Sequence, residues 1–179
     1  MISYTIINKI NIVFYNDKIV EHFIQLSESD KRMRFGMPIK NEAIISYVKN
    51  GTASPSSYWV IAEWLDPFNV FEKKVVGVGH LYFDKENNSE IGLSISDGFK
   101  RRGIGSNIMS FSIILSNLFL SSKISGLTLR SNKQMISLAK KMNFDFEGGG
   151  TSEIEAVKRF DYNPLTAFNI FLNIKHSDY

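Results

Sequence analysis

The sequence contains no cysteine and only three histidines, His22, His80 and His176, which lie far apart along the chain. The absence of cysteine excludes structural disulfides, thiolate zinc sites and cysteine nucleophiles. With so few imidazoles and no thiolate, a histidine-rich metal site is not expected either. We therefore predict that the protein uses no metal.

Charge of one sign is not concentrated in any part of the chain. Lysine and arginine total 21 and aspartate and glutamate total 18, so the net charge is +3. The longest basic clusters, Lys31-Arg32-Met33-Arg34 and Lys100-Arg101-Arg102, are both short. Because a nucleic-acid-binding surface needs more extensive clusters, we predict no nucleic-acid partner. The slight excess of positive charge is compatible with a small anionic ligand.

No secretion or membrane segment is predicted. The amino terminus lacks the basic region of a signal peptide. Residues 103–122 are uncharged over about 20 residues, the length of a membrane span, but serines and asparagines interrupt the run. Its bulky residues fall on one face of an amphipathic helix: Ile104, Ile108, Phe111, Leu115 and Leu118. We therefore expect a cytoplasmic protein without a membrane partner, in which this helix packs on a sheet.

Composition and hydrophobic periodicity predict a single domain over residues 1–179. Apolar residues make up 44% of the chain and charged residues 22%, as in ordinary globular proteins. The pattern predicts an α/β (α+β) fold with a central mixed, mostly antiparallel sheet flanked by helices. Strands are expected at about 10–15, 58–65, 75–83, 90–95, 126–130, 144–147 and 153–160. Helices are expected at about 17–26, 28–35, 41–49 (ending at Asn50-Gly51), 104–121, 133–142 and 164–175.

The segment from Ser94 to Ser106 has the pattern of an anion site. It leaves a predicted strand, turns, and enters the uncharged helix, with Gly103 and Gly105 separated by one residue. Glycines let the backbone approach a ligand, and the first amides of a helix lack partners and carry partial positive charge. Such a helix start suits a phosphate or pyrophosphate, and the basic triplet 100–102 adds charge. The spacings of a P-loop and of a dinucleotide fingerprint are absent. The alternative is a glycine-rich turn without a ligand.

Two blocks of the sequence resemble the GCN5-related N-acetyltransferases (GNAT). Lys-Arg-Arg-Gly-Ile-Gly at 100–105 is similar to their acetyl-coenzyme A signature, Gln/Arg-x-x-Gly-x-Gly/Ala, and follows a strand ending in Leu-Ser-Ile. The second block is the strand 127–132 ending in Asn132, the helix 135–142, and Asn143-Phe144. The resemblance covers about residues 57–150. The start of the chain, with Leu-Ser at 26–27 and Arg-Phe at 34–35, is weakly similar to bacterial protein-lysine acetylase domains.

This resemblance implies a GNAT-like fold that uses acetyl-coenzyme A (acetyl-CoA) as co-substrate. A backbone amide at positions 93–95 would polarise the thioester carbonyl, and Asn132 would contact the pantetheine arm, although Asn132 equally suits a helix N-cap. The residues implied to bind acetyl-CoA are Leu93, Ser94, Ile95, Lys100, Arg101, Arg102, Gly103, Ile104, Gly105, Ser106 and Asn132.

The sequence departs from the GNAT pattern at three positions. Lys100 stands where glutamine or arginine is usual, so it keeps a charge but loses the planar fork. Asn143 replaces a glycine, and asparagine tolerates a left-handed backbone. Ala139 stands where many members carry a tyrosine that protonates the departing thiolate, a role that alanine cannot perform. Solvent can protonate this leaving group, because a thiol has a pKa of about 8.5.

Glu90 and His80 are the candidate general bases. The attacking amine must lose a proton, and Glu90 lies where similar protein acetylases carry a glutamate, opposite the apolar face of its strand. The alternative for Glu90 is a solvated residue at the strand end. His80, on the preceding strand, has a suitable intrinsic pKa, and its alternative is a hydrogen-bonded sheet histidine.

The sequence therefore predicts an acetyl-CoA-dependent N-acetyltransferase of EC class 2.3.1. The acceptor would be a primary amine, either a protein lysine or N-terminus or a small amine, which attacks directly in a ternary complex. Ala139 favours an alternative, a catalytically degenerate GNAT fold that binds coenzyme A (CoA) as a sensor or interaction module. The expected state is a monomer or homodimer.

Overall fold

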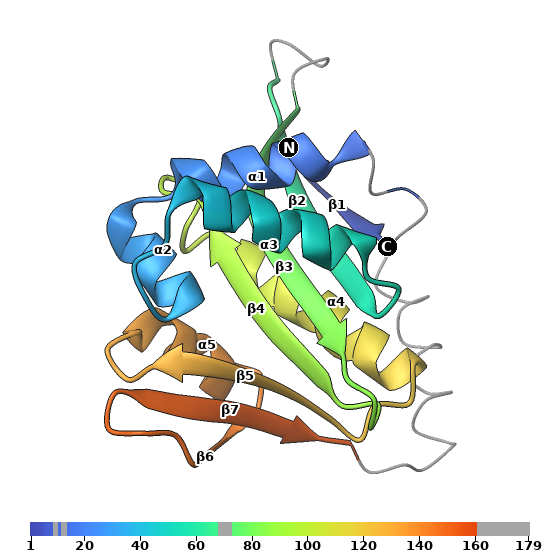
Figure 1. Ribbon diagram of the computed structural model, residues 1–179, viewed down its shortest axis with the longest axis vertical. Coiled ribbons are helices and arrows are strands. Elements are labelled where there is room, and N and C mark those ends of the chain that lie inside the picture. Colours follow the sequence, from blue (N-terminus) through green and yellow to red (C-terminus); the bar gives the residue numbers. More distant parts are fainter. Residues whose placement is uncertain (9–10, 12–13, 68–72, 161–179) are drawn as a thin grey trace.

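Seven strands form one mixed sheet, in the order β1-β2-β3-β4-β5-β7-β6 (Figure 1). The structure, a computed structural model, describes residues 1–8, 11, 14–67 and 73–160. The strands are β1 Ile2–Ile7, β2 Ser57–Leu65, β3 Lys73–Phe83, β4 Ser89–Ile95, β5 Lys123–Leu129, β6 Asp145–Glu147 and β7 Glu153–Arg159. Of the described strand pairs only β4 and β5 run parallel, and the others are antiparallel. The predicted fold class is confirmed.

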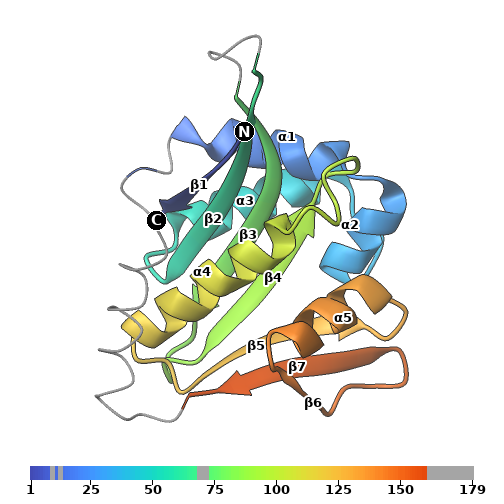
Figure 2. The ribbon, with the colours of Figure 1, turned by 180° about the vertical axis from the view of Figure 1, so that it is seen from behind.

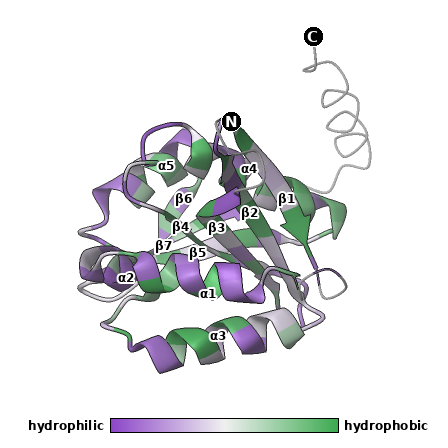
Figure 3. Cartoon of the chain, turned by 90° about the horizontal axis from the view of Figure 1, so that it is seen from above, coloured by the Kyte–Doolittle hydropathy of each residue, from purple (hydrophilic) through white to green (hydrophobic). Residues whose placement is uncertain are grey.

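Helices cover both faces of this sheet. They are α1 Asn16–Gln25, α2 Glu28–Phe35, α3 Asn41–Ala53, α4 Ile104–Leu118 and α5 Lys133–Lys141. Seen from above, α1, α2 and α3 lie on one side of the strands and α4 and α5 on the other (Figure 3), and the view from behind shows α4 along β3 and β4 (Figure 2). Phe23, Ile44 and Trp59 anchor the core under α1 and α3, whereas Ile108 and Ile124 belong to the core under α4.

Ser27 and Gly36 define the two ends of α2. Ser27 caps the helix by accepting a hydrogen bond from the Asp30 amide at 3.1 Å, as its hydroxyl is suited to do. Gly36, with φ +77°, ends the helix in the left-handed conformation that glycine adopts without strain. The helix is therefore short, and it contacts both β4 and β5.

Two sequence predictions were wrong, the strand at 10–15 and the end of the third helix at Gly51. Residues 11, 14 and 15 of the strand expected at 10–15 are not in a strand, and Tyr15 is the N-cap of α1. Residues 9–10 and 12–13 lie outside the described residues. The amino-terminal strand is instead β1, which pairs with β2. Gly51 does not end α3. It lies inside the helix, where a Cβ would come within 2.7 Å of Trp59, so this glycine lets α3 approach the sheet. The helix predicted at 164–175 lies outside the described residues.

The uncharged segment forms the expected amphipathic helix. Ile104, Ile108 and Leu115 of α4 are buried as predicted, whereas Leu118, at the end of the helix, is 60% exposed. In the described part of the chain, no helix combines the length and apolar character needed to cross a bilayer.

Candidate functional site

Strands β4 and β5 leave one edge of β4 open. They pair only at Ser89–Ile124 and Glu90–Ser125 and then diverge, as Figure 1 shows. The amide of Ser96 donates to Val76 across the sheet at 2.9 Å, so even-numbered residues of β4 direct their amides to β3. Successive amides of a strand point to opposite sides. The amides of Leu93 and Ile95 therefore face the opening, where an extended ligand can pair with them like an added strand.

The first turn of α4 offers unpaired amides beside this opening. Gly103, with φ +82°, is the N-cap of the helix, and in the described structure no side chain caps it. The first intrahelical bond runs from the Asn107 amide to the Gly103 carbonyl at 3.0 Å. The amides of Ile104, Gly105 and Ser106 thus have no intrahelical acceptor and form an anion site at the positive end of the helix dipole.

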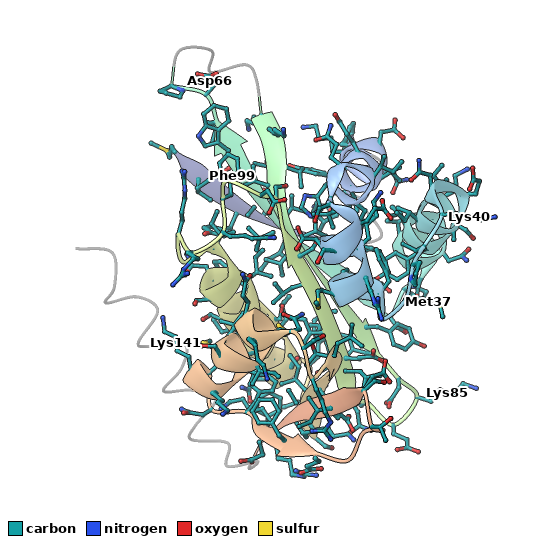
Figure 4. The ribbon with its side chains drawn as sticks, turned by 90° about the vertical axis from the view of Figure 1, so that its left-hand side faces the viewer. Met37, Lys40, Asp66, Lys85, Phe99 and Lys141 are labelled. Carbon is teal, nitrogen blue, oxygen red and sulfur yellow. The ribbon has the colours of Figure 1, made fainter. Side chains whose placement is uncertain are left out.

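A single cleft of about 1070 Å³ joins the strand opening, the start of α4, and the facing sides of α2 and α5. Lys141, labelled on α5, and Met37, labelled next to α2, lie on opposite sides of the strands in Figure 4. The predicted site residues that line the cleft are His80, Glu90, Leu93, Ser94, Ile95, Lys100, Arg101, Gly103, Gly105, Ser106 and Asn132. The structure therefore brings together residues that the sequence separates by more than fifty positions.

Two of the predicted cofactor-binding residues do not line the cleft. Arg102 points its guanidinium over the ring of Phe99, 5.3 Å from the ring centroid, and Figure 4 shows Phe99 on the loop before α4. The side chain of Ile104 is only 2% exposed because it packs in the core. Ile104 can therefore serve a ligand only through its backbone amide.

Lys100 connects the loop before α4 to α2. Its ammonium lies 2.7 Å from the Asp30 carboxylate and 2.8 Å from that of Asp97. Burial disfavours the charge on Lys100, but the hydrogen bonds to the two carboxylates outweigh it and raise the pKa of the ammonium. The ion pair with Asp30 holds α2 over the cleft, and direct contact of Lys100 with a ligand stays a prediction.

The second sequence block forms the other wall of the cleft. The Asn132 side chain accepts a hydrogen bond from the Met135 amide at 3.1 Å, so Asn132 is the N-cap of α5. Asn143 has a φ of 58°, the left-handed conformation expected where the GNAT pattern has glycine. Ala139 is fully buried in the core and accepts a hydrogen bond from the Phe144 amide at 3.0 Å. No acid group therefore reaches the cleft from this position.

We expect the Ala139→Tyr variant to lose stability and to gain no activity. A phenol ring cannot fit a fully buried alanine site without displacing its neighbours, and overpacking typically costs about 1–3 kcal/mol. Denaturant unfolding should show this loss, and Ser137→Tyr, on the cleft side of the same helix, is the matched control. A faster Ala139→Tyr enzyme of normal stability would contradict the expectation.

The two candidate bases have different surroundings. Glu90 is exposed, lies opposite Tyr82 on β3, and marks the last β4–β5 pair, at the closed end of the opening. His80 stacks on Trp59, with ring centroids 4.0 Å apart, and both of its nitrogens have partners, the Tyr47 hydroxyl at 2.6 Å and the Ser57 hydroxyl at 3.0 Å. Burial, assisted by the charge of Arg34, lowers the pKa of His80 to about 3.

The sequence interpretation missed three polar residues beside the cleft. Arg34 and Tyr47 line it, and His22 lies behind β4, where its ring nitrogens contact the Ser94 hydroxyl at 2.8 Å and the Ser96 hydroxyl at 3.1 Å. Their only signal in the sequence was the Arg-Phe pair at 34–35, since nothing local relates them to β4. In the described part of the chain, no cluster of histidine and acidic residues has the composition of a metal site.

Solved structures show the same arrangement of helices and strands. The GNAT domain of S. lividans PAT is 12% identical, with a TM-score of 0.71 over 88% of this chain and 89% of that domain. The chain has the GNAT fold. An acetyltransferase of the GNAT family from Streptococcus pneumoniae, 13% identical, shares it with a TM-score of 0.64 over 89% of this chain and 100% of that one.

The GNAT fold is also that of a structure determined with CoA. The PaiA N-acetyltransferase from Thermoplasma acidophilum in complex with CoA is 13% identical, with a TM-score of 0.64 over 89% of this chain and 99% of that one. No protein-family profile matches the present sequence, and no curated protein matches it. At such identities the activity has to be argued from the chemistry of the cleft.

Proposed function

We propose that this protein transfers an acetyl group from acetyl-CoA to a primary amine. The observation that supports it best is the adjacency, in one cleft, of an open β4 edge and the unpaired first amides of α4. These two features suit the two ends of one ligand, an extended amide-containing arm and a pyrophosphate. The GNAT fold, which PaiA shares in its complex with CoA, supports the same assignment.

In this proposal acetyl-CoA lies along β4 with its pyrophosphate at α4. The amides of Ile104, Gly105 and Ser106 bind the phosphate oxygens, and Arg101, beside them in the cleft wall, adds positive charge. The pantetheine pairs with the open edge, so the amides of Leu93 and Ile95 lie where a thioester carbonyl oxygen can accept a hydrogen bond. Such a donor stabilises the oxyanion that forms when the carbonyl is attacked.

Glu90 is the proposed general base. It is exposed to the cleft at the closed end of the opening, so it can accept the amine proton directly or through water. The amine nitrogen then bonds to the carbonyl carbon, the carbon–sulfur bond breaks, and the thiolate leaves. Because the α5 position of the usual tyrosine is a buried alanine, Ala139, the thiolate takes its proton from solvent.

A thiol-release assay with acetyl-CoA and a panel of amines tests this function. The panel should contain a lysine peptide, a peptide with a free N-terminus, a polyamine and small amino acids, because the GNAT fold alone does not select among them. Release of CoA that depends on one amine class, together with the acetylated product in the mass spectrum, would support acetyl transfer.

The buried Ala139 favours a second candidate, a CoA-binding protein without turnover. Tight CoA binding in calorimetry, combined with no thiol release from any amine, would select it. A cytoplasmic location and a monomeric or homodimeric state stay predictions for either function.

The Gly105→Val variant should bind acetyl-CoA at least tenfold more weakly, a loss of about 1.4 kcal/mol. A Cβ at this position would lie 3.4 Å from Leu138 and 3.9 Å from Ile95 and Leu93, so the added methyl groups extend into the cleft between α5 and β4. Calorimetry on the folded variant measures the affinity. Gly150→Val is the matched control, because a Cβ there meets no atom within 4 Å. Unchanged affinity for Gly105→Val would exclude this pyrophosphate site.

A further inference from the structure

Arg34 places a positive charge in the cleft that has no carboxylate partner. It lies one helical turn after Asp30 on α2, lines the cleft and is half-buried. None of the ion pairs between described residues includes it. Its guanidinium lies instead among aromatic rings, 5.0 Å from the centroid of Phe35, 5.4 Å from Tyr47 and 5.6 Å from Phe23.

Most hydrogen-bond donors of this guanidinium are unused within the described structure. One Nη donates to the Tyr47 hydroxyl at 2.5 Å, whereas the Nε–H is buried and has no acceptor. A charge withdrawn from water is costly unless it is paired, and ring faces compensate only part of that cost. An arginine fork is suited to two parallel bonds with a carboxylate. The remaining donors of Arg34, which lines the cleft, therefore suit an anionic partner.

Gly92 makes the room for this guanidinium over β4. A Cβ at Gly92 would come within 2.5 Å of the Arg34 guanidinium carbon. Glu90 lies two residues earlier on the same strand, so it shares a face with Gly92, about 7 Å away along the strand. The unpaired cation is therefore next to the proposed base, on the face of β4 that α2 covers, and away from the pyrophosphate amides of α4.

A chain of hydrogen bonds holds Arg34 in this position. Arginine can only donate, so the Tyr47 oxygen accepts from Arg34. The arrangement that uses the donors of both Tyr47 and His80 then has the Tyr47 hydroxyl donating to Nδ1 of His80, and Nε2 of His80 donating to the Ser57 hydroxyl. A neutral His80 fits this chain, in agreement with its lowered pKa. Tyr47 is thus a positioning residue for Arg34.

We infer that the amine acceptor carries a carboxylate in the same small molecule, and that Arg34 binds this carboxylate while Glu90 receives the proton of the amine. The inference rests on the proposed acetyl transfer and specifies its acceptor as a small amino acid, not a polyamine. The charge of Arg34, next to the proposed base, selects the carboxylate. The position of Arg34 between α2, α3 and β4 favours a small molecule.

The decisive experiment compares amino acids with their amides. Kinetics of CoA release should be measured for ω-amino acids of one to five methylenes and for the corresponding amides, which keep the amine and lose the charge. We expect the kcat/KM of the best acid to exceed that of its amide at least tenfold. Arg34→Gln should abolish this preference, and Arg34→Lys, which keeps the charge but loses the fork, should retain part of it.

Arg32→Gln is the matched control, because Arg32 is an exposed arginine of the same helix that does not line the cleft. It should leave the preference unchanged. Tyr47→Phe should weaken the preference, because it keeps the ring but removes the hydroxyl that orients Arg34. Equal kcat/KM for acid and amide, or equal losses in Arg34→Gln and Arg32→Gln, would overturn the inference.

An equilibrium measurement separates this inference from the proposed function. The N-acetylated acid and its N-acetylated amide are titrated into CoA-loaded protein by calorimetry, which requires no turnover. We expect the acid to bind at least tenfold more tightly, and the difference to vanish in Arg34→Gln. If no amine is acetylated but the acid still binds selectively, the result contradicts acetyl transfer and supports the carboxylate site at Arg34. If turnover occurs but acid and amide bind equally, the result contradicts the carboxylate site at Arg34 and supports acetyl transfer.

Discussion

The Glu90→Gln variant should lose about 10²–10⁴ in kcat while binding acetyl-CoA almost normally. Glutamine keeps the shape of the side chain and removes its basicity, and general-base catalysis typically contributes a factor of this size. Glu90 lies at the closed end of the β4–β5 opening, whereas the pyrophosphate amides belong to α4, at the other end of β4. The loss should therefore appear in turnover and not in the calorimetric affinity for acetyl-CoA.

Two control variants make this result specific. Glu86→Gln removes the same charge from the turn before β4 and should leave kcat within about threefold, whereas general-base loss is far larger. His80→Gln should keep turnover well above that of Glu90→Gln, because both nitrogens of His80 are already hydrogen-bonded. A normal rate in Glu90→Gln beside a severe loss in His80→Gln would assign the base to His80 instead.

The parts of the site that were predictable from sequence are those specified by adjacent residues. The glycines and basic triplet at 100–105 lie next to one another, so their spacing already describes a strand-to-helix turn with free amides. The same holds for Asn132, which both ends a loop and caps α5 through the Met135 amide. Periodicity located the three-strand meander because β2, β3 and β4 each pair with their neighbour in sequence.

The parts that were not predictable depend on contacts between distant elements. The opening exists because β4 and β5 pair at only two positions, and a hydrophobic pattern identifies strands without saying where a pair ends. The carboxylate site at Arg34 needs Arg34 from α2, Tyr47 from α3 and His80 from β3. Gly92 is the clearest sign of this site in the sequence near β4. The need for glycine there is evident only when α2 packs on β4 and brings the Arg34 guanidinium over it.

The amino-terminal strand was assigned to the wrong residues for a related reason. The run at 10–15 is more consistently apolar than Ile2–Ile7, and apolar runs are the main signal for strands. The observed β1 has a half-buried pattern and gains its order from pairing with β2 over its whole length. The carboxyl-terminal helix prediction at 164–175 remains untested.

Folding stability should fall steeply as the pH decreases from about 6.5 to about 4.5, because two histidines are buried in neutral form. Burial is the largest cause that lowers the pKa of His22 from 6.5 to about 4, and the charges of Arg34 and Lys74 add to it. Burial and the charge of Arg34 lower the pKa of His80 from 6.5 to about 3. Both folded-state values lie below the unfolded value, so in this interval the unfolded chain binds protons that the folded protein does not.

Proton linkage gives the sign and the size of this effect. Stability rises with pH wherever the unfolded state binds more protons, so it is greatest above pH 6.5 and is lost on acidification. Each histidine contributes up to about 1.4 kcal/mol per pH unit, and the two together contribute up to about twice that slope. A domain is typically stable by about 5–15 kcal/mol, so acidification to pH 4 should remove a large part of the stability.

Urea unfolding at several pH values measures how the unfolding free energy depends on pH. Variants of each histidine give the share that each one contributes. His22→Gln and His80→Gln should each remove about half of the dependence of the unfolding free energy on pH above pH 4.5. The exposed carboxylates of Asp84 and Glu147 add little in that range, because their pKa values are lowered from 3.8 and 4.5. Proton NMR gives a second test that is independent of how stable the variants are. The imidazole resonances of His22 and His80 should not titrate above about pH 5, and His176→Gln identifies the resonance of the third histidine. Midpoints near 6.5 for His22 and His80 would contradict the buried neutral state on which both the acid sensitivity and the Tyr47–His80 contact depend.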